Sequence, residues 1–169
     1  GQGFGNAVAD VLLGVTEPGG RLPTTWPAAE ADVPVLSCTP TDGALEYAEG
    51  IHIGYRAWLR QEAAPAYWFG SGRGYTRIDL VGVDAPERAR PGEVVTVTVE
   101  VANRGERDGK QVVQVYAERD GSAVDRPVRW LVGSAPVRVP AGATTTVPAP
   151  CRRCRRERRR RRLRLLPWR

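Results

Sequence analysis

Hydrophobic and polar residues alternate with two different periods along the chain. Apolar side chains between residues 7 and 12 recur at the spacing of one helical face, which predicts a helix with Asn6 as its N-cap and Gly14 just beyond its end. From Ile78 onward the period becomes two, most clearly at residues 95–101, where valines alternate with polar side chains. The pattern therefore predicts a helical first part followed by an all-β part.

Three shorter segments divide the first part. Residues 21–27 have a proline near each end, which favours an extended edge segment over a helix. Residues 51–55 alternate isoleucine and tyrosine with polar or small residues, which predicts a short strand with one buried face. Residues 67–76 hold three glycines flanked by aromatic side chains, so we predict a tight crossing loop at residues 71–78 that separates two domains.

The second part predicts a β-sandwich. Its expected strands, separated by polar turns or by Gly and Pro, are residues 95–101, 111–117, 130–132, 137–139 and 144–147. Short strands at this spacing are typical of two packed antiparallel sheets. We therefore assign residues 79–150 to one all-β domain.

Six short motifs, in this order, resemble the C-terminal part of glycoside hydrolase family 3, the family of many β-glucosidases and β-xylosidases. They are the Gly-rich entry to the predicted helix at 1–14, Pro-Gly-Gly-Arg-Leu-Pro at 18–23, Tyr-Ala-Glu-Gly-Ile with Gly-Tyr-Arg at 47–56, Phe-Gly-x-Gly-x-x-Tyr-Thr at 69–76, Asn-Arg-Gly at 103–105, and Val-Val-Gln-Val-Tyr with Arg-Pro-Val at 112–128. Each motif alone is common, but their shared order and spacing are specific. The resemblance covers residues 1–147.

The resemblance implies an α/β plus all-β fold. Residues 1–70 would form the C-terminal part of an α/β sandwich domain, and residues 79–150 an incomplete fibronectin type III-like β-sandwich. It also implies a parent enzyme that hydrolyses terminal β-linked sugars by a retaining mechanism, with two carboxyl groups about 5–5.5 Å apart and no cofactor. In the family both carboxyl groups precede the stretch that resembles residues 1–14. We therefore assign no catalytic residue here, and expect the oligosaccharide or glycoside substrate to bind through other domains of the parent.

Tyr47 and Glu49 are the candidates for a substrate contact in the parent enzyme, because the motif that holds them combines an aromatic ring with a carboxylate. The alternative is structural: Glu49 orders its own loop by accepting backbone N–H groups or by pairing with Arg56, and Tyr47 packs into the core. We expect Trp26, Trp58 and Trp68 to pack rather than to bind.

No metal site is expected. His52 is the single histidine, and a structural zinc site needs four ligands. Cys151 and Cys154 have the spacing of half such a site, but only Cys38 and His52 remain to complete it. Three cysteines are also too few for a disulfide scaffold.

Composition excludes several classes of protein. Hydrophobic residues make up 41% of the chain, which is too many for a wholly disordered protein. Apolar runs are only a few residues long, so no membrane-spanning helix is expected. The N-terminus lacks the regions of a signal peptide and a starting Met, so we expect the chain to begin inside a longer protein.

The formal net charge of +6 combines two unlike parts. Residues 151–169 hold eleven arginines and one glutamate, whereas residues 1–150 hold 14 basic and 18 acidic residues, so the tail carries +10 and the body −4. Consecutive arginines at residues 158–162 would bind polyanions, which makes nucleic acid a partner if the tail is genuine.

We favour a frameshifted or disordered tail. The resemblance ends near Pro148, and in a GC-rich gene alanine codons read one base out of register encode arginine. A sandwich that lacks its last strands exposes sheet edges and has a small core, so marginal stability is expected. Two other functional classes remain open: a β-sandwich binding module with a polybasic arm for nucleic acid or anionic surfaces, and a carbohydrate-binding module.

Overall fold

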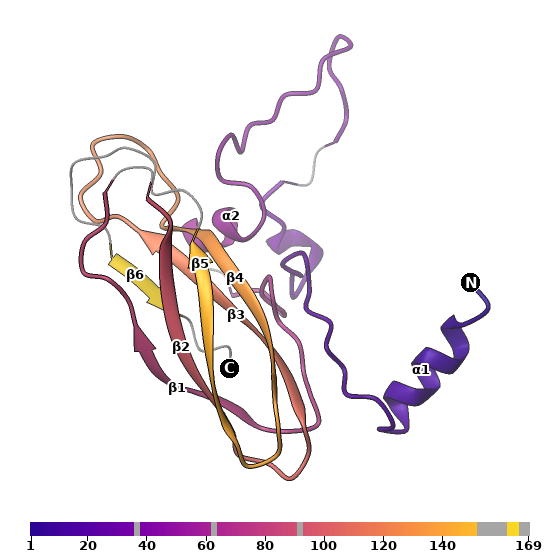
Figure 1. The fold of residues 1–169 in the computed structure, drawn as a ribbon. Coiled ribbons are helices and arrows are strands. Elements are labelled where there is room, and N and C mark those ends of the chain that lie inside the picture. Colours follow the sequence, from indigo (N-terminus) through magenta and orange to yellow (C-terminus); the bar gives the residue numbers. More distant parts are fainter. Residues whose placement is uncertain (36–37, 62–63, 91–92, 152–161, 166–169) are drawn as a thin grey trace.

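The computed structural model describes residues 1–35, 38–61, 64–90, 93–151 and 162–165 (Figure 1). In chain order these residues form helix α1 (Phe4–Leu12), a 3-10 helix η1 (Glu30–Asp32), helix α2 (Tyr55–Arg60), and strands β1 (Ile78–Asp84), β2 (Val95–Asn103), β3 (Gly109–Glu118), β4 (Arg129–Val139), β5 (Thr144–Cys151) and β6 (Arg162–Leu165). The helices precede the strands, which confirms the predicted order of a helical part and an all-β part.

The strands form two antiparallel sheets that pack face to face. One sheet has the order β1-β2-β5 and the other the order β4-β3-β6. Because side chains alternate across a strand, the odd-numbered residues of β2 from Val95 to Val101 all face the partner sheet and are buried. They pack with buried side chains of β3, β4 and β5, namely Val113, Val115, Val139, Val147, Ala149 and Cys151. The predicted β-sandwich is confirmed.

Strand β3 is buried on both faces over its second half. Residues 113–118 alternate between the sandwich core and the opposite face, where the ring of Tyr116 meets the ring of Tyr55 from α2. A strand covered on both sides needs a nearly continuous apolar run, which is what residues 112–117 provide. The first part of the chain therefore completes the burial of β3.

The predicted strand at residues 51–55 is wrong. These residues form a turn and then enter α2, with Ile51 and Ile53 about half exposed. The backbone N–H of His52 donates to the carbonyl of Glu49 at 2.9 Å, which closes the turn, and Gly54 has a φ of +54° where the chain enters the helix. Alternation over only three apolar positions is weak, and within the described residues no strand lies beside this segment to pair with it.

The two short strands predicted at residues 130–132 and 137–139 are a single strand, β4. Its pairing with β3 shifts by one residue opposite Val115 and Tyr116. The strand runs through Gly133, where this irregularity falls, and through Pro136, which pairs with Val112 in regular register.

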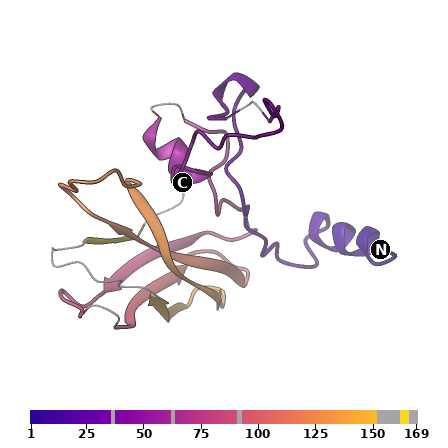
Figure 2. The same cartoon turned by 90° about the horizontal axis from the view of Figure 1, so that it is seen from above.

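Helix α1 projects away from the sandwich in both views (Figures 1 and 2). It begins at Phe4 with Gly3, not the predicted Asn6, at the N-cap, and Gly14 follows its end with a φ of +72° as predicted. None of its residues is buried, and Phe4 and Leu12 are 73% and 75% exposed. The helix therefore leaves an apolar stripe uncovered within the described residues.

The predicted extended segment at residues 21–27 pairs with residues 67–71, at and just before the start of the crossing loop. Trp26 and Tyr67 form an antiparallel bridge with N···O distances of 2.7 and 3.3 Å, and the Leu22 N–H donates to the carbonyl of Ser71. The crossing loop is thereby fixed on one side before the chain enters β1.

The basic tail supplies one short strand. Backbone pairing places β6 beside residues 115–118 of β3, at an edge where the sequence predicts no strand. The rest of the tail after Cys151, including Cys154 and the start of the arginine run, lies outside the described residues. Among the described residues there is no helix long and apolar enough to cross a membrane.

Candidate functional site

The predicted substrate-loop residues lie in the turn before α2. Tyr47 is 73% exposed, so it does not pack into a core formed by the described residues. Glu49 is partly buried, and its Oε2 atom is buried without a hydrogen-bond partner in the described part of the chain. That oxygen therefore does not form the alternative pairing with Arg56, whose guanidinium instead lies 5.8 Å from the centre of the Tyr55 ring.

His52 connects this turn to the sandwich. Its side chain is buried, and Nε2 lies 3.1 and 3.0 Å from Oδ1 and Oδ2 of Asp125 in the β3–β4 connection. A carboxylate only accepts, so Nε2 carries the proton and donates to Asp125. Arg60 of α2 adds a longer ion pair of 3.9 Å to the same carboxylate. The turn, α2 and the β3–β4 connection therefore meet at Asp125.

Lowering the pH should release this contact. The hydrogen bond from His52 lowers the pKa of the Asp125 carboxyl from its ordinary 3.8, and Arg60 acts in the same direction. A carboxyl whose pKa is depressed by folding stabilises the fold above its unfolded pKa, and this stabilisation is lost as the pH falls through the folded value. We expect the thermal midpoint of the native chain to fall more steeply than that of Asp125→Asn between about pH 5 and about pH 3.

Circular dichroism at each pH measures this difference, and the effect is small because the carboxylate is largely exposed. Asp120→Asn, in the same connection and also exposed, is the matched control and should follow the native chain. Identical slopes for the native chain and Asp125→Asn would contradict the role of this contact.

An aromatic cluster fixes α2 on β3. The ring centre of Tyr55 lies 5.2 Å from that of Phe69 and 5.8 Å from that of Tyr116, the latter edge-on. The Tyr55 hydroxyl accepts the Leu131 N–H at 2.8 Å, and burial raises the pKa of the Tyr116 hydroxyl well above its ordinary value. The tyrosine of Gly-Tyr-Arg and the phenylalanine of Phe-Gly-x-Gly are thus packing residues that join the two parts of the chain.

A second set of contacts joins the segment after α1 to the sandwich. The Arg21 guanidinium donates to Gln111 Oε1 at 2.9 Å and to the Lys110 carbonyl at 2.8 Å. Arg107 donates to the carbonyl of Gly14, and its guanidinium lies 5.4 Å from the ring centre of Tyr75. We call these contacts and the aromatic cluster together the interdomain seam.

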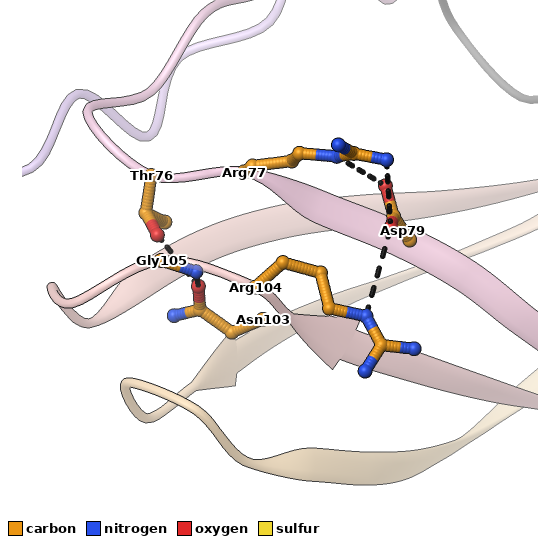
Figure 3. Close-up of polar contacts among 6 residues, drawn as sticks. All are labelled: Thr76, Arg77, Asp79, Asn103, Arg104 and Gly105. Atoms are coloured by element: carbon orange, nitrogen blue, oxygen red, sulfur yellow. Dashed lines mark hydrogen bonds and ion pairs between the residues drawn. The ribbon is translucent and has the colours of Figure 1, made fainter.

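Asn103 is the polar centre at the end of the crossing loop (Figure 3). Its Oδ1 accepts from Thr76 Oγ1 at 2.6 Å and from the Gly105 N–H at 3.0 Å. Its Nδ2 donates to the carbonyls of Arg107 and Val139 at 2.7 and 3.0 Å. One buried amide therefore joins three segments of chain: the crossing loop, the β2–β3 turn and the end of β4.

An ion-pair cluster lies on the surface beside this amide (Figure 3). The carboxylate of Asp79 in β1 forms two ion pairs. Its Oδ1 lies 3.1 Å from Arg77 Nε, and its Oδ2 lies 3.6 Å from Arg104 Nε. Because both arginine side chains are largely exposed and Asp79 is about one third exposed, these ion pairs add little to the stability of the fold.

The tryptophan and cysteine side chains considered in the sequence analysis differ in how far they are buried. Trp58 is 4% exposed and packs as predicted, whereas Trp26 is 53% exposed and its indole N–H donates to Thr24 Oγ1 at 3.0 Å. Trp68 is partly buried. Cys38 is exposed and Cys151 buried, and among the described residues no three His, Cys, Asp or Glu side chains gather into a possible metal site.

Sequence reasoning missed Asp125, Gln114 and Asn103 as contact-forming residues. Asp125 lies 73 positions from His52, so no local period connects them. The available signal was motif membership, because Asn103 and Gln114 lie in quoted motifs and Asp125 immediately precedes one. The motifs marked these neighbourhoods but not the partners.

Comparison with known sequences places both parts of the chain. Residues 1–75 match the glycosyl hydrolase family 3 C-terminal domain, and residues 111–156 match the fibronectin type III-like domain. A beta-glucosidase of Rhizobium radiobacter is 41% identical over 151 residues, which cover 86% of this chain and 18% of that protein. A probable beta-glucosidase I of Neosartorya fischeri is 37% identical over 153 residues, with 87% and 18% covered.

Solved structures give the same result. The crystal structure of DesR, a beta-glucosidase from Streptomyces venezuelae in complex with D-glucose, superposes with a TM-score of 0.76 at 34% identity, covering 86% of this chain and 19% of that one. Beta-glucosidase 3B from Thermotoga neapolitana in complex with glycerol superposes with a TM-score of 0.81 at 32% identity, covering 90% and 22%. The chain thus spans about a fifth of the length of these proteins.

Proposed function

Since this chain belongs to glycoside hydrolase family 3, with the family's C-terminal domain followed by its fibronectin type III-like domain, we propose that it works as the C-terminal portion of an enzyme that hydrolyses terminal β-linked glucosides. The observation that carries the proposal is the 41% identity to a beta-glucosidase over 86% of this chain. The names of these relatives give no support to a nucleic-acid-binding module with a polybasic arm.

Catalysis in this proposal belongs to parts of the enzyme other than this chain. A retaining hydrolase needs two carboxyl groups about 5–5.5 Å apart on either side of the glycosidic bond. The resemblance implies that the nucleophilic Asp lies in a further domain of the family, a (β/α)8 barrel, and that the acid/base Glu lies upstream of the stretch that matches residues 1–14. The exposed apolar stripe of α1 supports this division, because such a stripe is normally covered by the rest of an α/β domain.

The chain's own contribution is to position the turn at residues 47–51. The interdomain seam fixes α2, and the bond from His52 to Asp125 fixes the end of the turn next to it. The exposed ring of Tyr47 offers a face on which a sugar can stack, and Glu49 Oε2 is an acceptor that still lacks a donor among the described residues. We therefore propose Tyr47 and Glu49 as substrate-loop residues of the parent enzyme.

A chimeric enzyme tests both the proposed role of the whole chain and the proposed role of its substrate-loop residues. Residues 1–150 of this chain replace the matching segment of the Rhizobium radiobacter beta-glucosidase, and turnover of an aryl β-glucoside is measured. We expect an active enzyme in which Glu49→Gln lowers kcat/KM about tenfold or more, because a hydrogen bond to a charged group contributes about 1.5–3 kcal/mol.

Glu46→Gln is the matched control, since Glu46 is exposed and lies three residues earlier in the same loop. Equal kcat/KM values for Glu49→Gln and Glu46→Gln would contradict a substrate contact by Glu49. An inactive but folded chimera would contradict the assignment of the chain. The isolated chain should show no turnover, and robust hydrolysis by it would overturn the placement of both catalytic carboxylates elsewhere.

A further inference from the structure

A pocket of about 380 Å³ lies between the turn before α2 and the β3–β4 connection. This volume is in the range of small-molecule sites, about 300–1,000 Å³. Its apolar lining comes from Ile51 on one side and from Val124, Pro127 and the Trp130 indole on the other. An aromatic ring with aliphatic neighbours provides a surface against which the C–H face of a sugar ring packs.

The polar lining consists of Arg56, Asp125 and Arg126. Each of these side chains is already held in place. His52 donates to both oxygens of Asp125, Arg126 Nε donates to Ser122 Oγ at 3.2 Å, and the Arg56 guanidinium lies over the Tyr55 ring. Groups fixed before binding lose less conformational entropy when a ligand arrives.

The hydrogen-bond donors and acceptors that line the pocket indicate which chemical groups a ligand must carry. Arginine side chains only donate hydrogen bonds, whereas an ionised carboxylate only accepts them. A hydroxyl group does both, so neighbouring sugar hydroxyls can satisfy the two kinds of group at once. The Asp125 carboxylate, whose pKa is lowered by the bond from His52, lies in the same lining as the two arginines, so the pocket offers charged acceptors and charged donors side by side.

We propose that this pocket binds a neutral pyranose ring, with the ring face against Trp130 and its hydroxyls on Asp125 and Arg126. The site lies against the fibronectin type III-like domain and needs no catalytic carboxyl group. It therefore goes beyond the proposed function, and a chain without hydrolytic activity still binds the sugar.

Ligand-observed NMR and calorimetry on the full 169-residue chain test the proposal with methyl β-D-glucopyranoside as the probe. A shallow site for one sugar predicts a Kd on the order of 1 mM. Asp125→Asn should weaken binding about fivefold or more, because the charged acceptor is lost. Asp120→Asn is the matched control, an exposed carboxylate in the same connection but outside the pocket lining, and should bind like the native chain.

Trp130→Phe removes part of the stacking surface and should also weaken binding. If that variant fails to fold, as judged by near-UV circular dichroism, Asp125→Asn alone decides, because its side chain lies on an exposed loop. No binding at about 50 mM glycoside would overturn the proposal. So would equal losses in Asp125→Asn and Asp120→Asn, or tighter binding of glucuronate than of the neutral glycoside, which would indicate an anion site.

Discussion

Asn103→Asp is expected to lower the free energy of unfolding by about 3–5 kcal/mol. The substitution removes two buried hydrogen bonds and leaves their acceptors without another donor. The side chain is 2% exposed, and both its amide oxygen and its amide nitrogen are bonded. Aspartate keeps the shape and the acceptor but loses the two N–H donors. Its carboxylate would then face the carbonyls of Arg107 and Val139 with nothing between them.

This loss is a large fraction of the stability of a domain, typically about 5–15 kcal/mol. Chemical denaturation followed by circular dichroism measures it. Asn6→Asp is the matched control, because Asn6 is the other asparagine in the chain and is exposed on α1. A difference between the two variants below about 1 kcal/mol would show that Asn103 does not hold the crossing loop on the sandwich.

Gly70→Ala should be the second most damaging substitution, at about 2–4 kcal/mol. Gly70 has a φ of +81°, a conformation that costs a residue with a Cβ about 1–2 kcal/mol. A Cβ added here would also lie 2.2 Å from Gln114 Nε2. Gln114 is buried and its Oε1 accepts from the Tyr116 hydroxyl at 2.7 Å, so its side chain cannot move aside without breaking that bond.

Gly43→Ala separates the two causes. Gly43 has a φ of +76°, but a Cβ there meets nothing within 4 Å. Thermal unfolding of both variants should therefore show a larger loss for Gly70→Ala, and the excess measures the contact with Gln114. If both variants lose the same amount, backbone strain alone explains the cost at Gly70, and Gly70 is not tightly packed against Gln114.

The β-sandwich could be predicted from the sequence because its signal is local. The alternating valines of β2 face the core in the order that the sequence predicts, and the turn at Gly142 precedes β5. A period of two over eight residues places side chains on one face whatever lies around them. The same argument failed at residues 51–55, where three apolar positions fit a strand but the chain forms a turn and then α2.

The seam and the pocket could not be predicted in this way. Tyr55 meets Tyr116, His52 meets Asp125, and Gly70 meets Gln114, each across more than 40 positions of sequence. Nothing in the local pattern around either partner depends on the other. The family motifs marked the neighbourhoods of these residues without showing which residues contact one another.

By itself, the sequence determined the order of the two parts, the faces of the sandwich strands and the family resemblance. Each of these depends on residues close together along the chain. Only the tertiary structure decided that the glycines and aromatics of the motifs form a seam, that Asn103 joins three segments, and that Asp125 faces both His52 and a pocket. These features depend on which distant segments meet when apolar surface is buried, and that is settled by packing of the whole chain.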